Sequence, residues 1–314
     1  MPTYEERIEG ALLGLLVGDA LGVPYEFHEP EDIPPLAKIE MEPPRGFRRA
    51  HPAASVGAWS DDGAQALCLL ESLLHVGSFD VGDFARRMVS WLERGHLAVD
   101  GHVFDVGVQT SRALRSIAQG KPILEAAPTG ENTNGNGALM RVLPLALFHD
   151  GTDAELVRDA RLSSCPTHPH VRSQVACALA CLYARSILDD RDDPWADAVT
   201  RLRAVLDGDG PARSELDTHV RPDEPPHGSG SGYVVDCLHS ARLALAAGPY
   251  ETAVRTAIAL GDDTDTTACV AGGLAGLRDG VQAIPARWRA ALRGRELLDP
   301  LLAGLLERVA RRAP

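Results

Sequence analysis

Four glycines spaced four residues apart constrain the fold of this chain more than any other feature of its sequence. They are Gly10, Gly14, Gly18 and Gly22, and the residues between them are mostly apolar. Residues four apart lie on the same face of a helix, and each glycine in a helix interior costs about 1 kcal/mol relative to alanine. We therefore expect a neighbouring helix to approach this face closely enough to offset that cost. Packing is the simplest interpretation of Gly10 and Gly14, whereas a functional role stays open near Asp19, where the helix is expected to end.

Apolar residues recur at helical spacing through much of the chain, and few stretches alternate apolar and polar residues as strands do. Ile8, Leu12 and Leu15, for example, line one face. The same spacing predicts later helices over residues 171–187, 195–206, 234–247, 251–260, 268–277 and 285–292. Aromatic residues make up only 5% of the chain, so small aliphatic side chains must fill the core, which favours closely packed helices. We predict an all-α fold, with one compact multi-helix domain over residues 1–314.

Two long stretches show no helical spacing. Residues 28–58 are rich in proline, glutamate and arginine, and residues 207–232 contain almost no apolar side chains. Structureless segments of this length are usually functional or disordered. We interpret 28–58 as a flap beside a candidate site and 207–232 as a surface insertion. The sequence shows no internal repeat and no domain boundary.

Composition and charge exclude several classes of function. The net charge of −13 argues against a general nucleic-acid-binding protein, which more often carries a basic face. No unbroken apolar run reaches the roughly 18 residues that span a bilayer. The segment 10–24 follows glutamates and is interrupted by Asp19, unlike a signal peptide, so we expect a buried helix there. Cys177 and Cys181 are interpreted as small core residues, and the chain has no C-x-x-C pair. We expect a cytoplasmic protein that binds no membrane.

Aspartates and hydroxyl residues gather at two predicted helix starts. The first group is Ser60, Asp61 and Asp62, and the second is Asp263, Asp265 and Thr266. Serine and aspartate are preferred helix N-caps, and the helix dipole favours acids in a first turn. Capping is the simpler interpretation of the first group. The second group holds more acids and hydroxyls than capping needs.

The alternative interpretation is a site for hard cations. Mg²⁺ and Mn²⁺ take carboxylate, hydroxyl and water oxygens, and alternate residues such as Asp263 and Asp265 can point two carboxylates at one ion. If the two groups converge, their mutual repulsion would be severe without divalent cations, and a centre of two metal ions follows. The spacing matches neither an EF-hand calcium loop nor a zinc site. We expect His168 and His170 to have a loop role rather than to bind zinc.

Two further segments contain groups that could bind an anion or transfer a proton. Residues 133–141 (TNGNGALMR) contain glycines that would let backbone N–H groups converge on an anion at a helix start, although an ordinary turn explains them equally well. Glu26 follows the end of the first helix and lies between Tyr25 and Phe27. It is either a surface acid or a carboxylate that moves protons over a site.

Taken together, these motifs resemble those of the ADP-ribosylglycohydrolase family, which contains dinitrogenase-reductase-activating glycohydrolase and the ADP-ribosyl-acceptor hydrolases. The segments that carry the resemblance are GALLGLLVGDALGVPYEF (10–27), WSDD (59–62), FDVGVQT (104–110), NGNGALMR (134–141), THPH (167–170) and LGDDTDTTACVAGGLAGL (260–277). Each segment alone is a weak signal. All of them in the family's order are highly specific.

The resemblance implies a compact all-α fold with a cleft that binds ADP-ribose and two divalent cations, Mg²⁺ or Mn²⁺. The group at Ser60, Asp61 and Asp62 would supply one side of the metal pair, and the group at Asp263, Asp265 and Thr266 the other. Family members often have threonine where this chain has Ser60 and Gly63. A hydroxyl survives at Ser60 and is lost at Gly63.

The resemblance also implies roles in catalysis and substrate binding. Glu26 matches the family's acid near the scissile bond, and Asp105 matches a second acid. His168 would pack near the distal ribose or adenine. The backbone N–H groups that would hold the diphosphate belong to the loop of Thr133, Asn134, Gly135, Asn136 and Gly137.

The implied activity is metal-dependent hydrolysis of the C1″ glycosidic bond between ADP-ribose and an acceptor, which releases ADP-ribose. The acceptor would be a protein arginine or serine, or the group carried by a small ADP-ribose conjugate such as an acetyl ester. Two other hypotheses stay open. One is a catalytically idle ADP-ribose-binding protein, against which the intact Glu26 and aspartates argue. The other is a di-metal hydrolase of a different nucleotide phosphoester.

Overall fold

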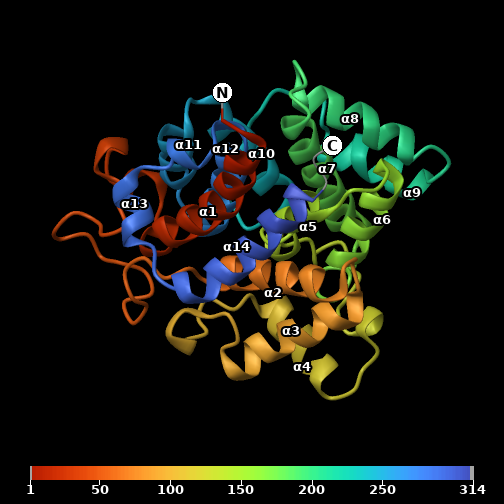
Figure 1. Ribbon diagram of the computed structural model, residues 1–314, viewed down its shortest axis with the longest axis horizontal. Helices are drawn as coiled ribbons and strands as arrows, with labels where there is room; N and C mark the ends of the chain where they lie inside the picture. The colour runs from red at the N-terminus through yellow and green to blue at the C-terminus, as the bar shows by residue number, and fades with distance from the viewer. Residues whose placement is uncertain (1, 312–314) are drawn as a thin grey trace.

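The computed structural model describes residues 2–311, and within them the chain forms α-helices and no β-strand. The helices are α1 (Tyr4–Gly22), α2 (Asp61–Val76), α3 (Val81–Arg94), α4 (Val108–Ala118), α5 (Leu143–Phe148), α6 (Asp153–Ser164), α7 (Val171–Leu188), α8 (Pro194–Val205), α9 (Gly210–Ser214), α10 (Val234–Ala246), α11 (Tyr250–Ala259), α12 (Thr264–Asp279), α13 (Ala286–Ala291) and α14 (Arg295–Ala310). Figure 1 shows their arrangement. The predicted all-α fold is confirmed.

Helices α1 and α12 pack antiparallel against each other in the interior of the fold (Figure 1). Gly10 and Gly14 of α1 face Gly276 and Gly272 of α12, and Gly18 faces Ala268. A Cβ atom at any of these three positions of α1 would overlap a carbonyl oxygen of α12. The predicted close approach of a second helix is therefore confirmed, and α12 contributes glycines of its own.

The antiparallel packing brings the C-terminal end of α1 to the start of α12. Gly22, the last residue of α1, lies against the backbone of Asp265 in the first turn of α12. Thr264 Oγ1 donates a hydrogen bond to the Gly22 carbonyl at 2.9 Å. Residues near Glu26 and residues of the second aspartate group therefore lie at the same end of the helix pair, although most of the chain separates them.

The stretch Tyr4–Tyr25 is long and apolar enough to cross a membrane by length and composition alone. In the structure, 94% of its most apolar window is buried inside the protein. A helix that is apolar all round packs in the core of a large domain as readily as in a membrane. The buried helix predicted for residues 10–24 is confirmed.

The helices predicted from apolar spacing are present, with small shifts at their ends. Helix α12 begins at Thr264, one turn before the predicted start, because the second aspartate group forms its first turn. Helices α3, α4, α6 and α14 are not among those predicted, and α14 contains Pro300, a residue that normally interrupts helices. All cysteines are free thiols, and Cys177 and Cys181 are buried in α7 as predicted.

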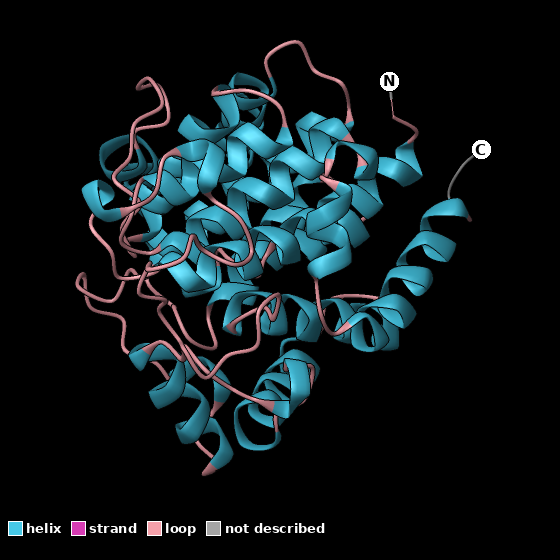
Figure 2. Ribbon diagram, turned by 90° about the vertical axis from the view of Figure 1, so that its left-hand side faces the viewer, coloured by secondary structure: helices cyan, strands magenta, loops and turns pink. Residues whose placement is uncertain are grey.

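Residues 207–232 are partly helical rather than structureless. Their first part forms α9 and a π-helix, Glu215–Val220. The side chains that this part buries are Ala212, Leu216 and Val220. They recur every four residues, so the segment attaches to the core through one face. The remainder, 221–232, is a loop, and Figure 2 shows the long connections gathered on one side of the helical body.

The segment 28–58 is attached to the body of the protein by Glu40. The Glu40 carboxylate accepts hydrogen bonds from Trp288 Nε1 and Arg255 Nη2, both at 2.6 Å. Ile39 and Met41 are buried on either side of it. This anchor fixes the middle of the segment, and its action as a flap stays a prediction.

Candidate active site

A cavity of about 340 Å³ lies at the end of the α1–α12 pair. Its wall comes from the segment after α1, the starts of α2, α4 and α12, and the glycine loop before α5. The predicted site residues that line it are Glu26, Asp61, Asp105, Gly135, Asn136, Gly137, His168, Asp263 and Thr266. Ser60, Asp62 and Asp265 do not line the cavity but are buried.

Asp19, on the last turns of α1, holds the first aspartate group in place. Its carboxylate accepts hydrogen bonds from the N–H groups of Ser60 at 2.9 Å and Gly63 at 2.7 Å, at the start of α2. Ser60 is also the N-cap, since its hydroxyl accepts from the Asp62 N–H at 3.4 Å. The capping interpretation is therefore correct for Ser60. It leaves the carboxylates of Asp61 and Asp62 available for other partners.

The absence of a side chain at Gly63 has a local cause. A Cβ atom there would lie 2.6 Å from Leu16 Cδ2 and 2.9 Å from Asp19 Oδ2. Glycine lets α1 and the start of α2 approach so closely that the Asp19 carboxylate reaches the backbone.

Asp263 precedes α12 but makes no side-chain capping bond to it. Its Oδ2 instead accepts a hydrogen bond from Asn136 Nδ2 at 2.9 Å. Thr266 Oγ1 donates to Asp62 Oδ2 at 3.3 Å and so joins the second group to the first. The two groups therefore converge, and capping does not account for the position of Asp263.

The converged carboxylates fit divalent cations. Possible ligand oxygens lie within 4.8 Å of one another in two sets: Asp61, Asp62 and Asp105, and Glu26, Asp263 and Asp265. Two buried oxygens, Asp62 Oδ1 and Asp265 Oδ2, accept no hydrogen bond from any residue of 2–311. A buried carboxylate oxygen without a donor is costly, and a divalent cation is a suitable partner for it. Each set combines an aspartate pair with one of the two predicted catalytic acids.

Burial favours the protonated form of these carboxyl groups when no cation is bound. It raises the pKa of Asp61, Asp62 and Asp265 well above the ordinary value, and repulsion between the neighbouring carboxylates adds to the rise. Burial also raises the pKa of Asp263, although the hydrogen bond from Asn136 opposes that rise. Divalent cations would offset both the desolvation and the repulsion.

Glu26 shares a short hydrogen bond with His51. Glu26 Oε2 lies 2.5 Å from His51 Nε2, and Asp105 Oδ1 lies 3.7 Å from the same nitrogen. Burial and then repulsion from Asp105 raise the pKa of Glu26 to about 10, whereas burial lowers the pKa of His51. Without bound cations, Glu26 therefore holds the proton and the neutral imidazole of His51 accepts the hydrogen bond.

The backbone after Glu26 is fixed by Asp262. The Phe27 N–H donates to the Asp262 carbonyl, and the Asp262 N–H donates to the His28 carbonyl, both at 2.8 Å. Asp262 and Phe27 have left-handed φ values of 57° and 62°, a conformation that is uncommon for residues with side chains. The side chain of Asp262 is exposed. Its contribution is the main-chain pairing that orients Glu26.

A buried chain of hydrogen bonds links the carboxylates to the glycine loop. Gln65 Nε2 donates to Asp61 Oδ2 at 2.9 Å, and Arg141 Nη1 donates to Gln65 Oε1 at 2.7 Å. Arg141 Nη2 donates to Thr167 Oγ1, which lies 2.8 Å from His168 Nδ1. Arg141 can donate a hydrogen bond but cannot accept one, so the proton of the Thr167 hydroxyl goes to its other partner, Nδ1 of His168. His168 therefore carries its hydrogen on Nε2.

His168 supports the glycine loop. A Cβ atom at Gly137 would lie 2.9 Å from His168 Cε1, and one at Gly135 would lie 3.4 Å from His168 Nε2. Burial, together with the charge of Arg141, lowers the pKa of His168 to about 3. The imidazole is therefore neutral at physiological pH, with its N–H group on the side of the loop.

Three groups of the predicted phosphate loop do not face the cavity. The Thr133 hydroxyl donates to carbonyl groups of its own turn. Asn134 Oδ1 accepts from Ser173 Oγ at 2.9 Å, so this side chain points to α7. The N–H of Asn136 donates to the Gly232 carbonyl at 3.0 Å, which removes it from the donors that a diphosphate could use. The N–H of Thr133 is likewise used within the protein, since it donates to the Gly130 carbonyl at 3.0 Å. The binding of a diphosphate by the other N–H groups of this loop stays a prediction.

Sequence reasoning missed several residues of the site. His51 lies in the proline-rich segment 28–58 with no motif around it. Tyr233 pairs with Gly135 through the backbone, and its hydroxyl accepts from Arg172 Nη1 at 3.2 Å. Asp19 gave the clearest signal, an acid inside an apolar, glycine-rich helix, but its role as the support of α2 needs the fold.

A comparison of the sequence with known protein families identifies the family of this chain. The family described as ADP-ribosylglycohydrolase matches residues 1–314. The chain belongs to the ADP-ribosylglycohydrolase family. The resemblance inferred from the sequence motifs is confirmed, and the protein is a hydrolase that acts on ADP-ribosylated substrates.

Several relatives match almost the full length of this chain. The ADP-ribosylarginine hydrolase Tri1 of Pseudomonas putida is 31% identical over 288 residues, which are 90% of this chain and 73% of that protein. The ADP-ribosyl-dinitrogen reductase glycohydrolase of Rhodospirillum rubrum is 30% identical over 93% of this chain and 92% of its own length. A solved ADP-ribosylglycohydrolase-related protein complex aligns with a TM-score of 0.75 and 33% identity, covering 97% of this chain and 98% of the solved chain.

Proposed function

We propose that this protein is a metal-dependent ADP-ribosyl-acceptor hydrolase that cleaves the C1″ glycosidic bond and releases ADP-ribose. The observation that carries the proposal is the pair of carboxylate sets beside the glycine loop. Their oxygens lie within 4.8 Å of one another, and two buried ones accept no hydrogen bond from residues 2–311. Such a concentration of buried acids is costly without cations to neutralise it, and cations at this place support a metal-dependent reaction beside the loop.

The side chains of the cavity suit this chemistry. Cleavage of the glycosidic bond builds positive charge on the ribose, which the carboxylates around it stabilise. When bound, two divalent cations supply the charge that neutralises the excess carboxylates and polarises water and hydroxyl oxygens. Glu26 gives a proton to the leaving group or takes one from water at Oε2, which His51 orients. The Nε2–H group of His168 and the glycine loop hold the distal part of the substrate.

Arginine is the acceptor that we propose to test first. Asp105 lines the cavity beside Glu26, and its side chain is 21% exposed. A carboxylate at that place suits a guanidinium group, which prefers charge-assisted hydrogen bonds. The relative from Pseudomonas putida carries the name of an ADP-ribosylarginine hydrolase, which supports the same choice.

A panel assay tests the proposal and its alternatives. ADP-ribosylated arginine and serine peptides and O-acetyl-ADP-ribose are incubated with the protein and Mg²⁺ or Mn²⁺, and the products are identified. We expect free ADP-ribose, released fastest from the arginine peptide. Binding without any product would favour the idle ADP-ribose-binding protein. Release of phosphate instead of ADP-ribose would favour a phosphoester hydrolase.

A further inference from the structure

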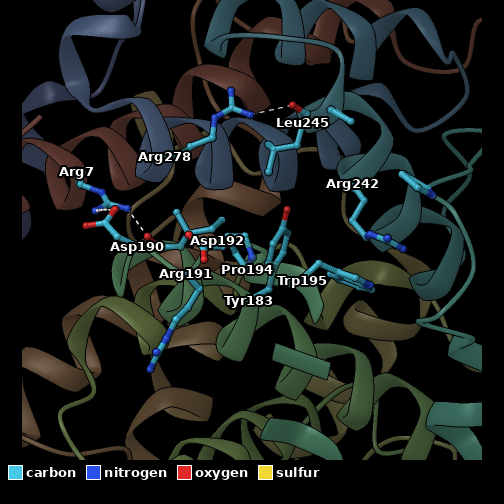
Figure 3. A pocket seen from close by; sticks show the side chains of 13 residues that line it. Arg7, Tyr183, Asp190, Arg191, Asp192, Pro194, Trp195, Arg242, Leu245 and Arg278 are labelled. Atoms are coloured by element: carbon cyan, nitrogen blue, oxygen red, sulfur yellow. Dashed lines mark hydrogen bonds and ion pairs between the residues drawn. The ribbon is translucent and has the colours of Figure 1, made fainter. Parts of the chain in front are cut away.

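Two cavities of the protein differ in how far the side chains around them are engaged with one another. The larger, of about 690 Å³, is lined by residues of α1, α7, α8, α10 and α12 (Figure 3). Charged groups of its wall have partners within the protein: Arg7 pairs with Asp190 at 2.8 Å, and Arg278 Nη1 donates to the Leu245 carbonyl at 2.8 Å. The candidate active site is different, because its mouth leaves large apolar side chains exposed.

These exposed side chains are Phe27 and Val108. Among the large apolar side chains of residues 2–311 they are the most exposed, at 68% and 66%, and both line the candidate active-site cavity. Single exposed apolar side chains are ordinary, but two at the mouth of one cavity indicate a surface that contacts a ligand. Phe27 directly follows Glu26, and Val108 begins α4 three residues after Asp105. The exposed apolar surface therefore adjoins the two predicted catalytic acids.

His51 connects the Phe27 ring to both acids. The centroid of the Phe27 ring lies 5.6 Å from that of the imidazole, and the ring of Phe104, the residue before Asp105, lies 5.3 Å from it. Nε2 of His51 also contacts the carboxylates of Glu26 and Asp105. Each acid therefore has a neighbour in the sequence whose phenyl ring packs on this one histidine.

The backbone of this arrangement is held in an uncommon conformation. Phe27, His51 and Asp105 have left-handed φ values of 62°, 46° and 52°, and Asp262, which pairs with the backbone of Phe27, has one of 57°. They are four of the eight residues other than glycine that adopt such values within 2–311. Residues of this kind cost stability and cluster where function needs a fixed geometry. The fold therefore fixes the exposed ring of Phe27 beside the acids.

The charge around the ring indicates which ligand it receives. The side chain of Asp105 is 21% exposed and lines the same cavity. Among the residues of 2–311 that line this cavity, none is an arginine or a lysine. The face of a phenyl ring attracts cations, and a carboxylate accepts strong hydrogen bonds from them. A guanidinium group suits both partners, because it is planar, stacks on rings and donates from its edge.

We propose that Phe27 and Asp105 form the subsite for the acceptor. The guanidinium group of an ADP-ribosylated arginine stacks on the Phe27 ring and donates to the Asp105 carboxylate. Serine and acetyl acceptors carry no positive charge, so the ring favours arginine over them. The inference rests on the proposed hydrolase function, because it concerns the acceptor of that reaction, and it makes Phe27 a residue that determines specificity.

The test compares Phe27→Leu with Phe27→Tyr. Leucine retains an apolar side chain without a π face, whereas tyrosine retains the ring. KM and kcat are measured with the ADP-ribosylated arginine peptide and Mg²⁺ or Mn²⁺. We expect KM to rise about fivefold or more in Phe27→Leu and to rise less in Phe27→Tyr.

Two reference measurements show that the effect belongs to the acceptor. Free ADP-ribose has no guanidinium group, so its inhibition constant should change less than about twofold in Phe27→Leu. With a serine peptide as the second substrate, the ratio of kcat/KM for arginine to that for serine should fall about fivefold or more. The control variant is Leu124→Ala, which shortens a side chain that is 53% exposed and lies outside this cavity. It should leave all these constants unchanged.

Several results would overturn the subsite. One is an equal KM in Phe27→Leu and Phe27→Tyr, because the π face would then contribute nothing. Another is an equal loss of affinity for free ADP-ribose and for the arginine peptide, which would show that Phe27 supports the whole cavity. A third is the same change of KM in Leu124→Ala.

Failure of the proposed function gives a different result. If the unmodified protein releases ADP-ribose from the serine peptide but neither binds nor cleaves the arginine peptide, the hydrolase function stands and the subsite is wrong. If it releases ADP-ribose from no acceptor, the hydrolase function is wrong. The uncleaved arginine peptide is then titrated into the same proteins by isothermal titration calorimetry. Weaker binding by Phe27→Leu than by Phe27→Tyr would still support the subsite, and equal binding would overturn it.

Discussion

Glu26 and Asp263 belong to one carboxylate set but differ in their contacts, so single substitutions can separate their roles. Asp263→Ala removes an oxygen that the proposed cations need. We expect a loss of roughly a thousandfold in turnover, or about 4 kcal/mol of transition-state stabilisation, together with lower metal occupancy. Turnover is measured by ADP-ribose release, and occupancy by elemental analysis of the purified protein.

Glu26→Gln should also lose turnover, but without the loss of metal. The amide retains the size of the side chain but cannot accept a proton, so most turnover should be lost while metal and ADP-ribose still bind. Calorimetry with ADP-ribose provides the binding measurement. If this variant turns over at a near-normal rate, Glu26 moves no proton and Asp105 has to be considered in its place.

His168 should make the stability of the protein depend on pH. Its pKa is about 3 in the folded protein against an ordinary value of about 6.5, so the unfolded chain takes up a proton that the native state does not. Stability from this residue is therefore complete above pH 6.5 and falls below it, by about 1.4 kcal/mol per pH unit. Urea unfolding at several pH values should show a shallower dependence for His168→Gln. An identical dependence in both proteins would mean that His168 titrates normally.

The sequence revealed the acids of the site better than their supports. Asp263 and Asp265 were visible because their group holds more acids and hydroxyls than helix capping requires, and Asp61 and Asp62 because they form a second such group that the family's motifs also contain. His51 was not, because a single histidine in a proline-rich loop carries no spacing that relates it to Glu26. The contact between them depends on the path of the segment 28–58, which only long-range packing determines.

The glycine loop should tolerate no large side chain at Gly137. A Cβ atom there would lie 2.9 Å from His168 Cε1, so Gly137→Val must displace the loop or the histidine. We expect the affinity for ADP-ribose to fall about tenfold or more, with the fold retained. The matched control is Gly130→Val, where a Cβ atom meets nothing within 4 Å. Equal affinity in the two variants would place the diphosphate elsewhere.

The contact between α1 and α12 should be the most sensitive part of the core. Gly14→Ala places a Cβ atom against the Gly272 carbonyl, and neither helix can move without disturbing the other glycine contacts. We expect a loss of about 2–4 kcal/mol in the free energy of unfolding. Gly210→Ala, in open space at the start of α9, should be neutral or slightly stabilising. Equal urea midpoints for the two variants would contradict this account.

Several helices were predicted from the helical spacing of their apolar residues, and the repeated glycines of α1 predicted that a second helix packs closely against it. The identity of that partner was not, since Gly272 and Gly276 show no more than a second small-residue pattern far along the chain. The helical part of 207–232 was missed for a related reason. Its apolar residues are few, and Leu216 and Val220 show a role only once there is a core for them to reach.

Removal of divalent cations should destabilise the whole protein, and more so at higher pH. Burial raises the pKa of Asp19 to about 7 and that of Glu26 to about 10, so the cation-free native state holds protons that the unfolded chain releases. Its stability therefore falls as the pH rises above about 4. Chelation should lower the melting temperature more at about pH 8 than at about pH 5, where protons take the place of the cations. No shift at either pH value would indicate that the carboxylates bind no stabilising cation, and equal shifts at both would indicate that protons do not take the place of the cations.

The antiparallel pairing of α1 with α12 has a consequence for how the protein is made. During synthesis α1 leaves the ribosome first, and its partner follows only after most of the chain has been translated. Until then the face of α1 that packs against α12 has no partner, and α1 is apolar enough to cross a membrane. The nascent chain therefore depends on chaperones or on transient contacts to stay soluble. A chain released before α12 would lack both the partner of α1 and two of the six carboxylates of the site, those of Asp263 and Asp265. Early termination therefore yields no partly active enzyme. Truncated chains are instead expected to be degraded by proteases.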